Sequence, residues 1–205
     1  MNDKWLIWAR QIQSIAQAGL AFSEDQYDID RYNQLRDLSV QIMSEYTEVS
    51  TEKVRELFAN ETGYQTPKVD IRSAVFRDNK ILMVREKIDG KWSLPGGWAD
   101  VNTTVKESAI KECFEEAGAV VKPHRIIAIK YVNRPNEFKF PFSAYKIFVE
   151  CELIEHKFAE NTETLESGFF GIDELPELST NRNTSEQVKM CFEAKNKVCL
   201  EPQFD

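Results

Sequence analysis

Residues 95–119 read PGGWADVNTTVKESAIKECFEEAGA, a turn followed by a helix pattern. Pro95-Gly96-Gly97 is typical of a tight turn, because glycine lets the backbone bend sharply and approach a neighbour closely. Thr104 and Glu107 have the spacing of a capping box, in which the two residues satisfy each other's free backbone N–H groups. Gly118 is a typical C-terminal stop. The stretch therefore predicts a helix from Thr104 to Ala117.

Three carboxylates gather on this helix, at Glu112, Glu115 and Glu116. At about 100° per residue we assign them to one arc. The opposite, buried arc is assigned to Ala109, Ile110, Cys113, Phe114 and Ala117. Like charges at this spacing repel, and acids near a helix C-terminus oppose the helix dipole. A solvated acidic face is the ordinary explanation, whereas a bound Mg²⁺ would offset the repulsion, since it prefers carboxylate oxygens.

The segment from Gly97 to Ala119 resembles the Nudix box, G-x5-E-x7-R-E-U-x-E-E-x-G-U, where U is aliphatic. The residues that match its glycines and later glutamates are Gly97, Glu112, Glu115, Glu116 and Gly118, with Cys113 and Ala119 at the two aliphatic positions. Two positions depart from the pattern. Thr103 replaces the first glutamate, and Lys111 replaces the arginine that usually braces the carboxylates.

The resemblance covers about residues 68–195 and implies the class α+β, as a Nudix-type α/β/α sandwich with a mixed sheet. A small all-α domain precedes it. That domain, residues 1–66, resembles the N-terminal domain of two-domain bacterial CDP-choline and ADP-ribose pyrophosphatases. We expect a boundary near Thr66-Pro67, with a helical domain at 1–66 for dimerisation and substrate-site support, and a hydrolase domain at 67–205.

Periodicity predicts three helices before this boundary. The first has apolar residues at helical spacing, namely Trp5, Trp8, Ile12, Ile15, Ala16 and Leu20. The second has Ile29, Tyr32, Leu35, Leu38, Ile42 and Tyr46. For the third, Ser50 is the predicted N-cap and Gly63 the stop. Its predicted buried side is Val54, Leu57 and Phe58.

After the boundary the sequence predicts strands in place of helices. The expected strands are Lys68–Phe76, Lys80–Val84, Lys91–Leu94, Arg125–Val132, Ser143–Leu153 and Gly168–Ile172. Asp78-Asn79 is expected to turn the first hairpin. A second helix is expected at Ser185–Asn196.

The resemblance implies a metal-dependent enzyme that hydrolyses the pyrophosphate bond of a nucleoside diphosphate linked to another moiety. CDP-choline is the first substrate expected, and ADP-ribose is an alternative that the sequence does not separate from it. Two further alternatives stay open. One is removal of oxidised nucleoside triphosphates, and the other is a non-catalytic ligand-sensing regulator with a helical DNA reader. Residues 1–66 hold six Lys or Arg against eleven Asp or Glu, and a net charge of −5 disfavours a DNA reader.

The expected site residues follow from these matches. Glu112, Glu115 and Glu116 are the expected ligands of Mg²⁺ or Mn²⁺, and the general base is a box glutamate, Glu163 or Glu166, with Glu166 preferred. Lys111 and Gly118 are expected to support the site. The expected substrate contacts are Arg72 and Arg85 to phosphate and the backbone of Gly96 and Gly97. One ring of Phe138, Phe140 and Phe142 is expected to stack on the base, with Phe140 as the candidate.

Composition limits the partners and the location. The net charge of −8 disfavours broad binding to nucleic acid or anionic lipid. No run approaches the roughly 20 apolar residues of a membrane span, and early charges interrupt any signal-peptide core. Four cysteines without a paired spacing are expected to be reduced, so we expect a cytoplasmic protein. Trp5 and Trp8, with the apolar stripes, predict a homodimer.

Overall fold

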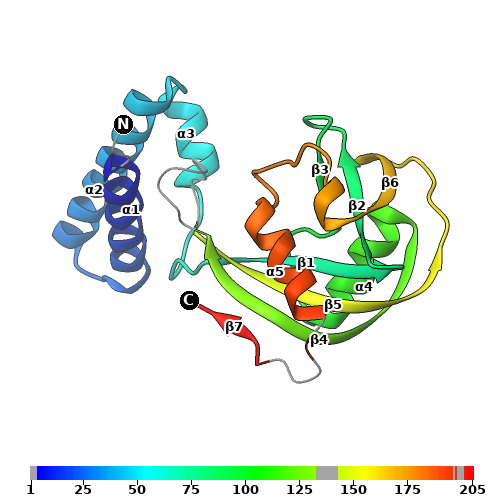
Figure 1. Ribbon diagram of the computed structural model, residues 1–205. Coiled ribbons are helices and arrows are strands. Elements are labelled where there is room, and N and C mark those ends of the chain that lie inside the picture. Colours follow the sequence, from blue (N-terminus) through cyan, green and yellow to red (C-terminus); the bar gives the residue numbers. More distant parts are fainter. Residues whose placement is uncertain (1–3, 133–142, 196, 198–200) are drawn as a thin grey trace. The chain divides into compact units, whose positions relative to one another are not determined.

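A computed structural model describes residues 4–132, 143–195, 197 and 201–205, and it divides the chain into two compact units (Figure 1). The first unit takes in the described residues up to Pro67 and is helical. The second contains the sheet, and its described residues fall within Lys68–Val132 and Ala144–Asp205.

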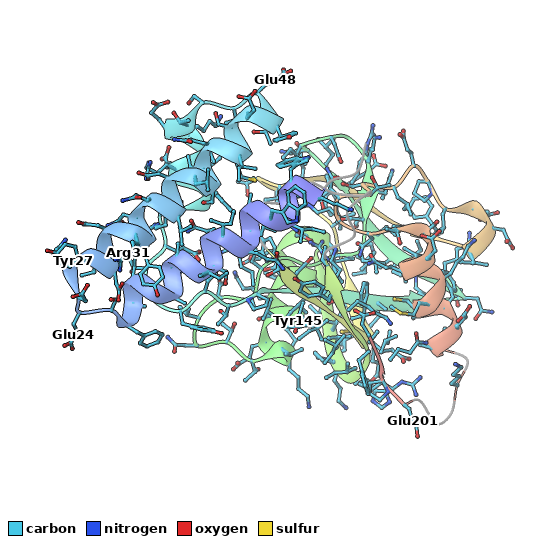
Figure 2. All side chains as sticks on the ribbon, turned by 90° about the vertical axis from the view of Figure 1, so that its left-hand side faces the viewer. Glu24, Tyr27, Arg31, Glu48, Tyr145 and Glu201 are labelled. Atoms are coloured by element: carbon cyan, nitrogen blue, oxygen red, sulfur yellow. The ribbon has the colours of Figure 1, made fainter. Side chains whose placement is uncertain are left out.

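The first unit consists of three helices, α1 (Lys4–Phe22), α2 (Gln26–Thr47) and α3 (Thr51–Phe58). Ser50 caps α3 as predicted, since its side chain accepts a hydrogen bond from the Lys53 N–H. At the end of α2, Glu48 adopts a left-handed conformation with φ 57° (Figure 2). The stop predicted at Gly63 is wrong, because α3 ends before Ala59, whose N–H bonds to the Arg55 carbonyl.

The buried face of α1 differs from the predicted apolar stripe. Its buried residues are Trp5, Leu6, Ala9, Gln13, Ala16 and Gln17. The two buried amides are satisfied, because Ser39 Oγ donates to Gln13 and Gln17 donates to the Gly63 carbonyl at 2.9 Å. Trp8 and Ile15 of the predicted stripe are 56% and 60% exposed, so only part of the stripe is packed within the first unit.

The same correction applies to α2 and α3. The buried residues of α2 are Ser39, Val40 and Met43, whereas Leu38 and Tyr46 of the predicted stripe are exposed. In α3, Val54 and Phe58 are buried and Leu57 is exposed. Helical spacing identified helices correctly but did not identify which arc the neighbouring helices would cover.

In its described residues the second unit has one sheet of seven strands, two α-helices and one short 3₁₀ helix. Its elements are β1 (Lys68–Arg77), β2 (Lys80–Glu86), β3 (Trp92–Ser93), α4 (Val105–Ala117), β4 (Ala119–Val132), β5 (Ala144–His156), β6 (Thr164–Phe170), the short 3₁₀ helix η1 (Ile172–Glu174), α5 (Ser185–Lys195) and β7 (Gln203–Phe204). The strand order is β3-β2-β1-β5-β4-β7, with β6 also paired to β2. β1 pairs with β5 in parallel and with β2 antiparallel, so the sheet is mixed.

The β1–β2 hairpin turns at Asp78 and Asn79 as predicted, with φ of 50° and 59°. Two central residues with positive φ match the right-handed twist of the flanking strands. Several predicted strand bounds were short. β4 begins at Ala119 and β6 at Thr164, because sheet pairing extends beyond the predicted bounds.

Alternating side chains of the strands form two cores on opposite faces of the sheet. On one face Ile71, Val75 and Val149 pack with Ala109 and Cys113 of α4. On the other face the packed residues are Ala74, Met83, Phe148, Val188 and Cys191, the last two from α5. Figure 1 shows the sheet between these two helices. The predicted α+β sandwich with a mixed sheet is therefore confirmed.

Two further sequence predictions can be compared with the described residues. Cys113, Cys151 and Cys191 are buried and unpaired, as predicted, while Cys199 lies outside the described part. Within the described residues no helix combines the length and hydropathy needed to cross a bilayer.

Candidate active site

The turn Pro95-Gly96-Gly97 is held against the part of β1 that precedes the residues paired with β2. The Ile71 N–H donates to the Gly97 carbonyl at 2.8 Å, and the Ser73 N–H donates to the Pro95 carbonyl at 2.9 Å. Gly96 has φ 147°, and a Cβ there would lie 1.9 Å from the Ile71 carbonyl oxygen. Only glycine fits between this strand and the helix behind it.

α4 has the local signals that the sequence predicted. Thr104 is its N-cap and forms the complete capping box with Glu107. Gly118 closes the helix in a left-handed conformation with φ 61°, and its N–H bonds to the carbonyls of Cys113 and Phe114. A Cβ at Gly118 would lie 2.3 Å from the Lys157 carbonyl, so the stop also permits close packing.

The three glutamates of α4 do not share one environment. Glu116 is buried, with 5% exposure, and its Oε2 accepts a hydrogen bond from the Gly96 N–H at 2.8 Å. The Glu112 carboxylate lies beside Gly97, where a Cβ would be 3.1 Å from Oε2. The Glu115 side chain is 57% exposed. The predicted arcs were therefore wrong for Glu116, which shares the buried face, and for Ile110 and Phe114, which are exposed.

Burial governs the protonation of these acids. It raises the pKa of Glu116 to about 8, although the Arg72 charge and the Gly96 N–H oppose the shift. Burial also raises the pKa of Glu112, and the Lys111 charge opposes it. A cation placed between these carboxylates and a phosphate would favour their ionised forms.

Lys111 lies among the acids as the arginine of the motif would. Its Nζ donates to Asp100 Oδ2 at 2.7 Å and lies 3.8 Å from Glu112 and 3.7 Å from Glu115. The hydrogen bond to Asp100 raises the Lys111 pKa. An ammonium group supplies the charge without the planar fork of arginine.

Thr103, at the position of the first box glutamate, belongs to the turn before α4. Its hydroxyl donates to the Asp100 carbonyl at 2.7 Å and lies 3.0 Å from Ser108 Oγ. It contributes no carboxylate to the site.

The later glutamates occupy different positions. Glu163 lies just before β6, and its charge raises the Glu112 pKa, which places it within electrostatic reach of the box. Glu166 lies within β6, although the predicted strand began only at Gly168. It pairs across the strands with Arg85, 3.7 Å from its guanidinium.

The two predicted phosphate-binding arginines already have protein partners. Arg72 is 1% exposed; its Nε donates to Asp70 at 2.9 Å and its Nη1 to the Leu94 carbonyl. Arg85 donates to the Gly90 carbonyl in addition to its pair with Glu166. Phe140, with Phe138 and Phe142, lies outside the described residues.

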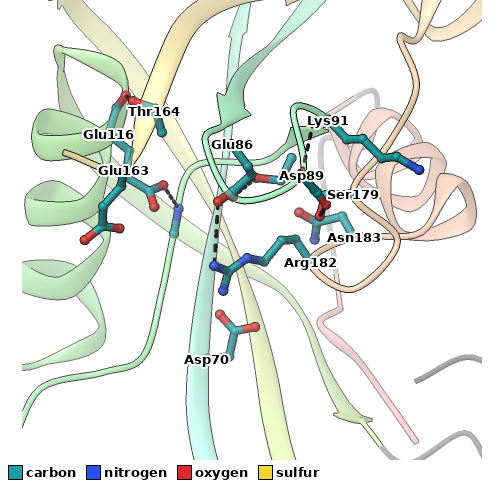
Figure 3. Close-up of polar contacts among 12 residues, drawn as sticks. Asp70, Glu86, Asp89, Lys91, Glu116, Glu163, Thr164, Ser179, Arg182 and Asn183 are labelled. Carbon is teal, nitrogen blue, oxygen red and sulfur yellow. Dashed lines mark hydrogen bonds and ion pairs between the residues drawn. The ribbon is translucent and has the colours of Figure 1, made fainter. Parts of the chain in front are cut away.

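Sequence reasoning missed a buried charge network next to Glu116 (Figure 3). Asp70 pairs with Arg72 and lies 3.3 Å from Lys146 Nζ. Glu86 accepts a hydrogen bond from Ser93 at 2.7 Å and lies 3.6 Å from Arg182. Burial lowers the Lys146 pKa to about 8. Charged residues inside otherwise apolar strands, at Asp70, Glu86 and Lys146, were the available signal.

No group of three His, Cys, Asp or Glu side chains in the described residues converges into a ready metal cage. The donor chemistry nevertheless fits Mg²⁺, which is commonly held by one or two carboxylates, water and substrate phosphates. Glu112, Glu115 and Glu116 could supply such carboxylates, and the first and last of them lie beside the Gly96-Gly97 turn.

Comparison with known proteins agrees with this geometry. A model described as the NUDIX domain matches residues 55–190. The chain belongs to the Nudix hydrolase family. A second model, described as a UDP-X-like N-terminal oligomerisation domain, matches residues 3–58. The predicted enzyme class is thus confirmed, and Nudix hydrolases generally use divalent metal ions.

Three relatives extend the comparison. The Bacillus subtilis protein YjhB, named provisionally as an ADP-ribose pyrophosphatase, is 44% identical over 94% of this chain and 93% of its own. An ADP-ribose pyrophosphatase structure from Streptococcus suis is 44% identical, with TM-score 0.63 over 68% of this chain and 100% of that chain. A UDP-X diphosphatase structure is 30% identical, with TM-score 0.63 over 99% and 100%.

Because the folded protein holds Glu116 in its protonated form, we expect the free energy of unfolding of the metal-free protein to fall as pH rises. The folded carboxyl keeps its proton to about pH 8, whereas the unfolded one loses it near the ordinary value of 4.5. Between these values the folded state binds more protons, so rising pH favours unfolding, on the order of a few kcal/mol. Urea unfolding across this window should show the loss, and added Mg²⁺ should reverse it at the alkaline end.

The matched variants are Glu116→Gln, which should flatten this pH dependence, and Glu115→Gln, which removes an exposed charge from the same helix and should retain it. Equal pH dependence in the wild type and Glu116→Gln would contradict the assignment.

Proposed function

We propose that this protein is a divalent-metal-dependent pyrophosphatase that hydrolyses a nucleoside diphosphate linked to a second moiety. The observation that carries the proposal is the buried Glu116 carboxylate bound to the Gly96 N–H, with Glu112 beside Gly97. These contacts bring the carboxylate helix and the turn together at one place. Hydrolysis there would add water to one phosphorus, break the P–O–P bridge and give two monophosphates.

The protein's own groups would prepare this reaction. Glu112, Glu115 and Glu116 would hold Mg²⁺ or Mn²⁺, which when bound supplies charge neutralisation and an acidified water. Lys111 would limit repulsion among the acids, since it contacts both Glu112 and Glu115. Of the two glycines expected to contact the diphosphate, only the partly exposed Gly97 remains a candidate, because Gly96 is buried and its N–H is bonded to Glu116.

ADP-ribose becomes the first substrate to test, because the names of two relatives at 44% identity concern it. CDP-choline, our first expectation from the sequence, remains a candidate beside UDP-linked compounds, which the UDP-X diphosphatase neighbour suggests. The shared chemistry is a nucleoside diphosphate ester. We also infer a cytoplasmic location, which the three buried free thiols support.

With Mg²⁺ we expect the purified protein to cleave ADP-ribose to AMP and ribose 5-phosphate. Glu115→Gln should lower kcat at least about 100-fold, since a catalytic cation contributes several kcal/mol. Glu155→Gln, on β5, is the charge-matched control and should leave kcat unchanged. Product chromatography over a panel of ADP-ribose, CDP-choline, a UDP-sugar and an oxidised dNTP identifies the substrate. Undiminished hydrolysis by Glu115→Gln would overturn the metal assignment.

For the general base, the position of Glu163 near Glu112 favours Glu163 over our earlier preference, Glu166. Glu163→Gln should lower kcat by about 100-fold or more, as loss of a general base does. Glu166→Gln should have a small effect, because that side chain is paired with Arg85. Steady-state rates of the two variants decide between them, and a larger loss for Glu166→Gln would restore the earlier assignment.

We further propose that residues 1–66 form a separate domain that dimerises the protein and supports the substrate site. The matching family model describes an oligomerisation domain, and Trp8, Ile15 and Phe22 expose an apolar row on α1. Trp5, which we counted in this surface from the sequence, instead is buried and stacks on Tyr46. The surface therefore depends on Trp8 and the residues in line with it.

Light scattering of the full chain should give the mass of a dimer. Trp8→Glu and Ile15→Glu should weaken association by at least about tenfold, because each places a charge in an apolar contact. Gln34→Glu makes an equal change in charge at an exposed position of α2, outside this row, and serves as the control. A monomeric mass for the wild type would refute the dimer.

A further inference from the structure

Three arginines of the second unit can be compared as phosphate ligands, and they differ in how many N–H donors the protein already uses. Arg72 is buried and bonded to Asp70 and Leu94. Arg85 is held by the Gly90 carbonyl and Glu166. Arg182, which the sequence analysis did not single out, has a side chain 35% exposed and one ion pair among the described residues, 3.6 Å to Glu86. A guanidinium has five N–H donors, so Arg182 keeps most of its donors available.

The backbone of Arg182 is fixed although its side chain is not. Its N–H donates to the Ser179 carbonyl at 2.8 Å, and its carbonyl accepts a hydrogen bond from the buried Lys146. The next residue, Asn183, is fully buried and accepts a hydrogen bond from the Leu94 N–H at 2.9 Å. The backbone of Arg182 is therefore held by hydrogen bonds, and it carries a long cationic side chain.

The backbone around Arg182 lies close to the Pro95-Gly96-Gly97 turn of the candidate site. Leu94 immediately precedes Pro95-Gly96-Gly97, and Gly96 bonds to Glu116. Glu86, the partner of Arg182, is close enough for its charge to raise the Glu116 pKa. Figure 3 shows the Arg182 side chain extending from its loop toward Glu86 and Asp70, while Lys91 points away from them.

We propose that Arg182 binds a phosphate oxygen of the nucleoside diphosphate substrate, opposite the carboxylates of α4. This inference rests on the proposed function and adds a substrate-binding residue to it. Planar guanidinium groups suit phosphate because two parallel N–H donors meet two oxygens. The long contact with Glu86 orients the side chain and can loosen when substrate arrives.

The test compares Arg182→Gln and Arg182→Lys with Lys91→Gln. Lys91 pairs with Glu177, which lies on the segment between η1 and α5 that also contains Arg182. Its substitution therefore removes one charge and one ion pair outside the site. The readouts are kcat and KM for ADP-ribose, and inhibition by imidodiphosphate, a non-hydrolysable mimic of pyrophosphate, with Mg²⁺ present.

We expect Arg182→Gln to raise KM and the imidodiphosphate inhibition constant roughly 10- to 100-fold, the worth of a charged hydrogen bond. Arg182→Lys should recover part of the loss, and Lys91→Gln should match the wild type. Values within about twofold of wild type for Arg182→Gln, or an equal change in Lys91→Gln, would overturn the proposal.

A merely structural role for Arg182 is separated with Glu86→Gln. If Arg182 acts only by neutralising Glu86, Arg182→Gln should have no effect in the Glu86→Gln background. Substrate binding predicts that the rise in KM persists there. Direct titration of the protein with imidodiphosphate separates this proposal from the proposed function. A wild type that hydrolyses no substrate refutes the proposed function. Weaker imidodiphosphate binding by Arg182→Gln than by the wild type supports the role of Arg182 even then.

Discussion

The hydrogen bond from the Gly96 N–H to the buried Glu116 carboxylate links the two halves of the candidate site. The donor belongs to a turn held against β1, and the acceptor belongs to a helix packed on one face of the same sheet. Gly96 has no side chain to separate the two elements. Without this contact a buried carboxylate would lack a backbone partner, and such a loss is costly in a low-dielectric interior.

The second constraint is the burial of charged side chains next to this hydrogen bond. Asp70 and Glu86 are buried, so their charges require nearby cations. Arg72 and Lys146 supply two of these from the interior, and Arg182 supplies a third from a half-exposed position. The network therefore stabilises the buried side of the turn, whereas Glu112, Glu115 and Lys111 lie nearer to solvent.

The local signals of the sequence were reliable where one short segment contained all the interacting groups. The capping box of Thr104 and Glu107, the left-handed stop at Gly118 and the Asp78-Asn79 turn all occur as predicted. The arcs of helices were less reliable. Gln13 and Gln17 are buried while Trp8 and Ile15 are exposed, because the neighbouring chain determines which arc is covered.

The sequence by itself determined the helix bearing the three glutamates, its cap and stop, the glycine turn before it and the α+β class, because these depend on neighbours in the chain. Tertiary structure decided that Glu116 is buried, that Arg72 is already paired, and that Lys146 meets Asp70 through the parallel register of β1 and β5. It also brought Arg182 to Glu86 from a distant loop. Those contacts join residues far apart in sequence. Their charges interact strongly only after folding removes water around them.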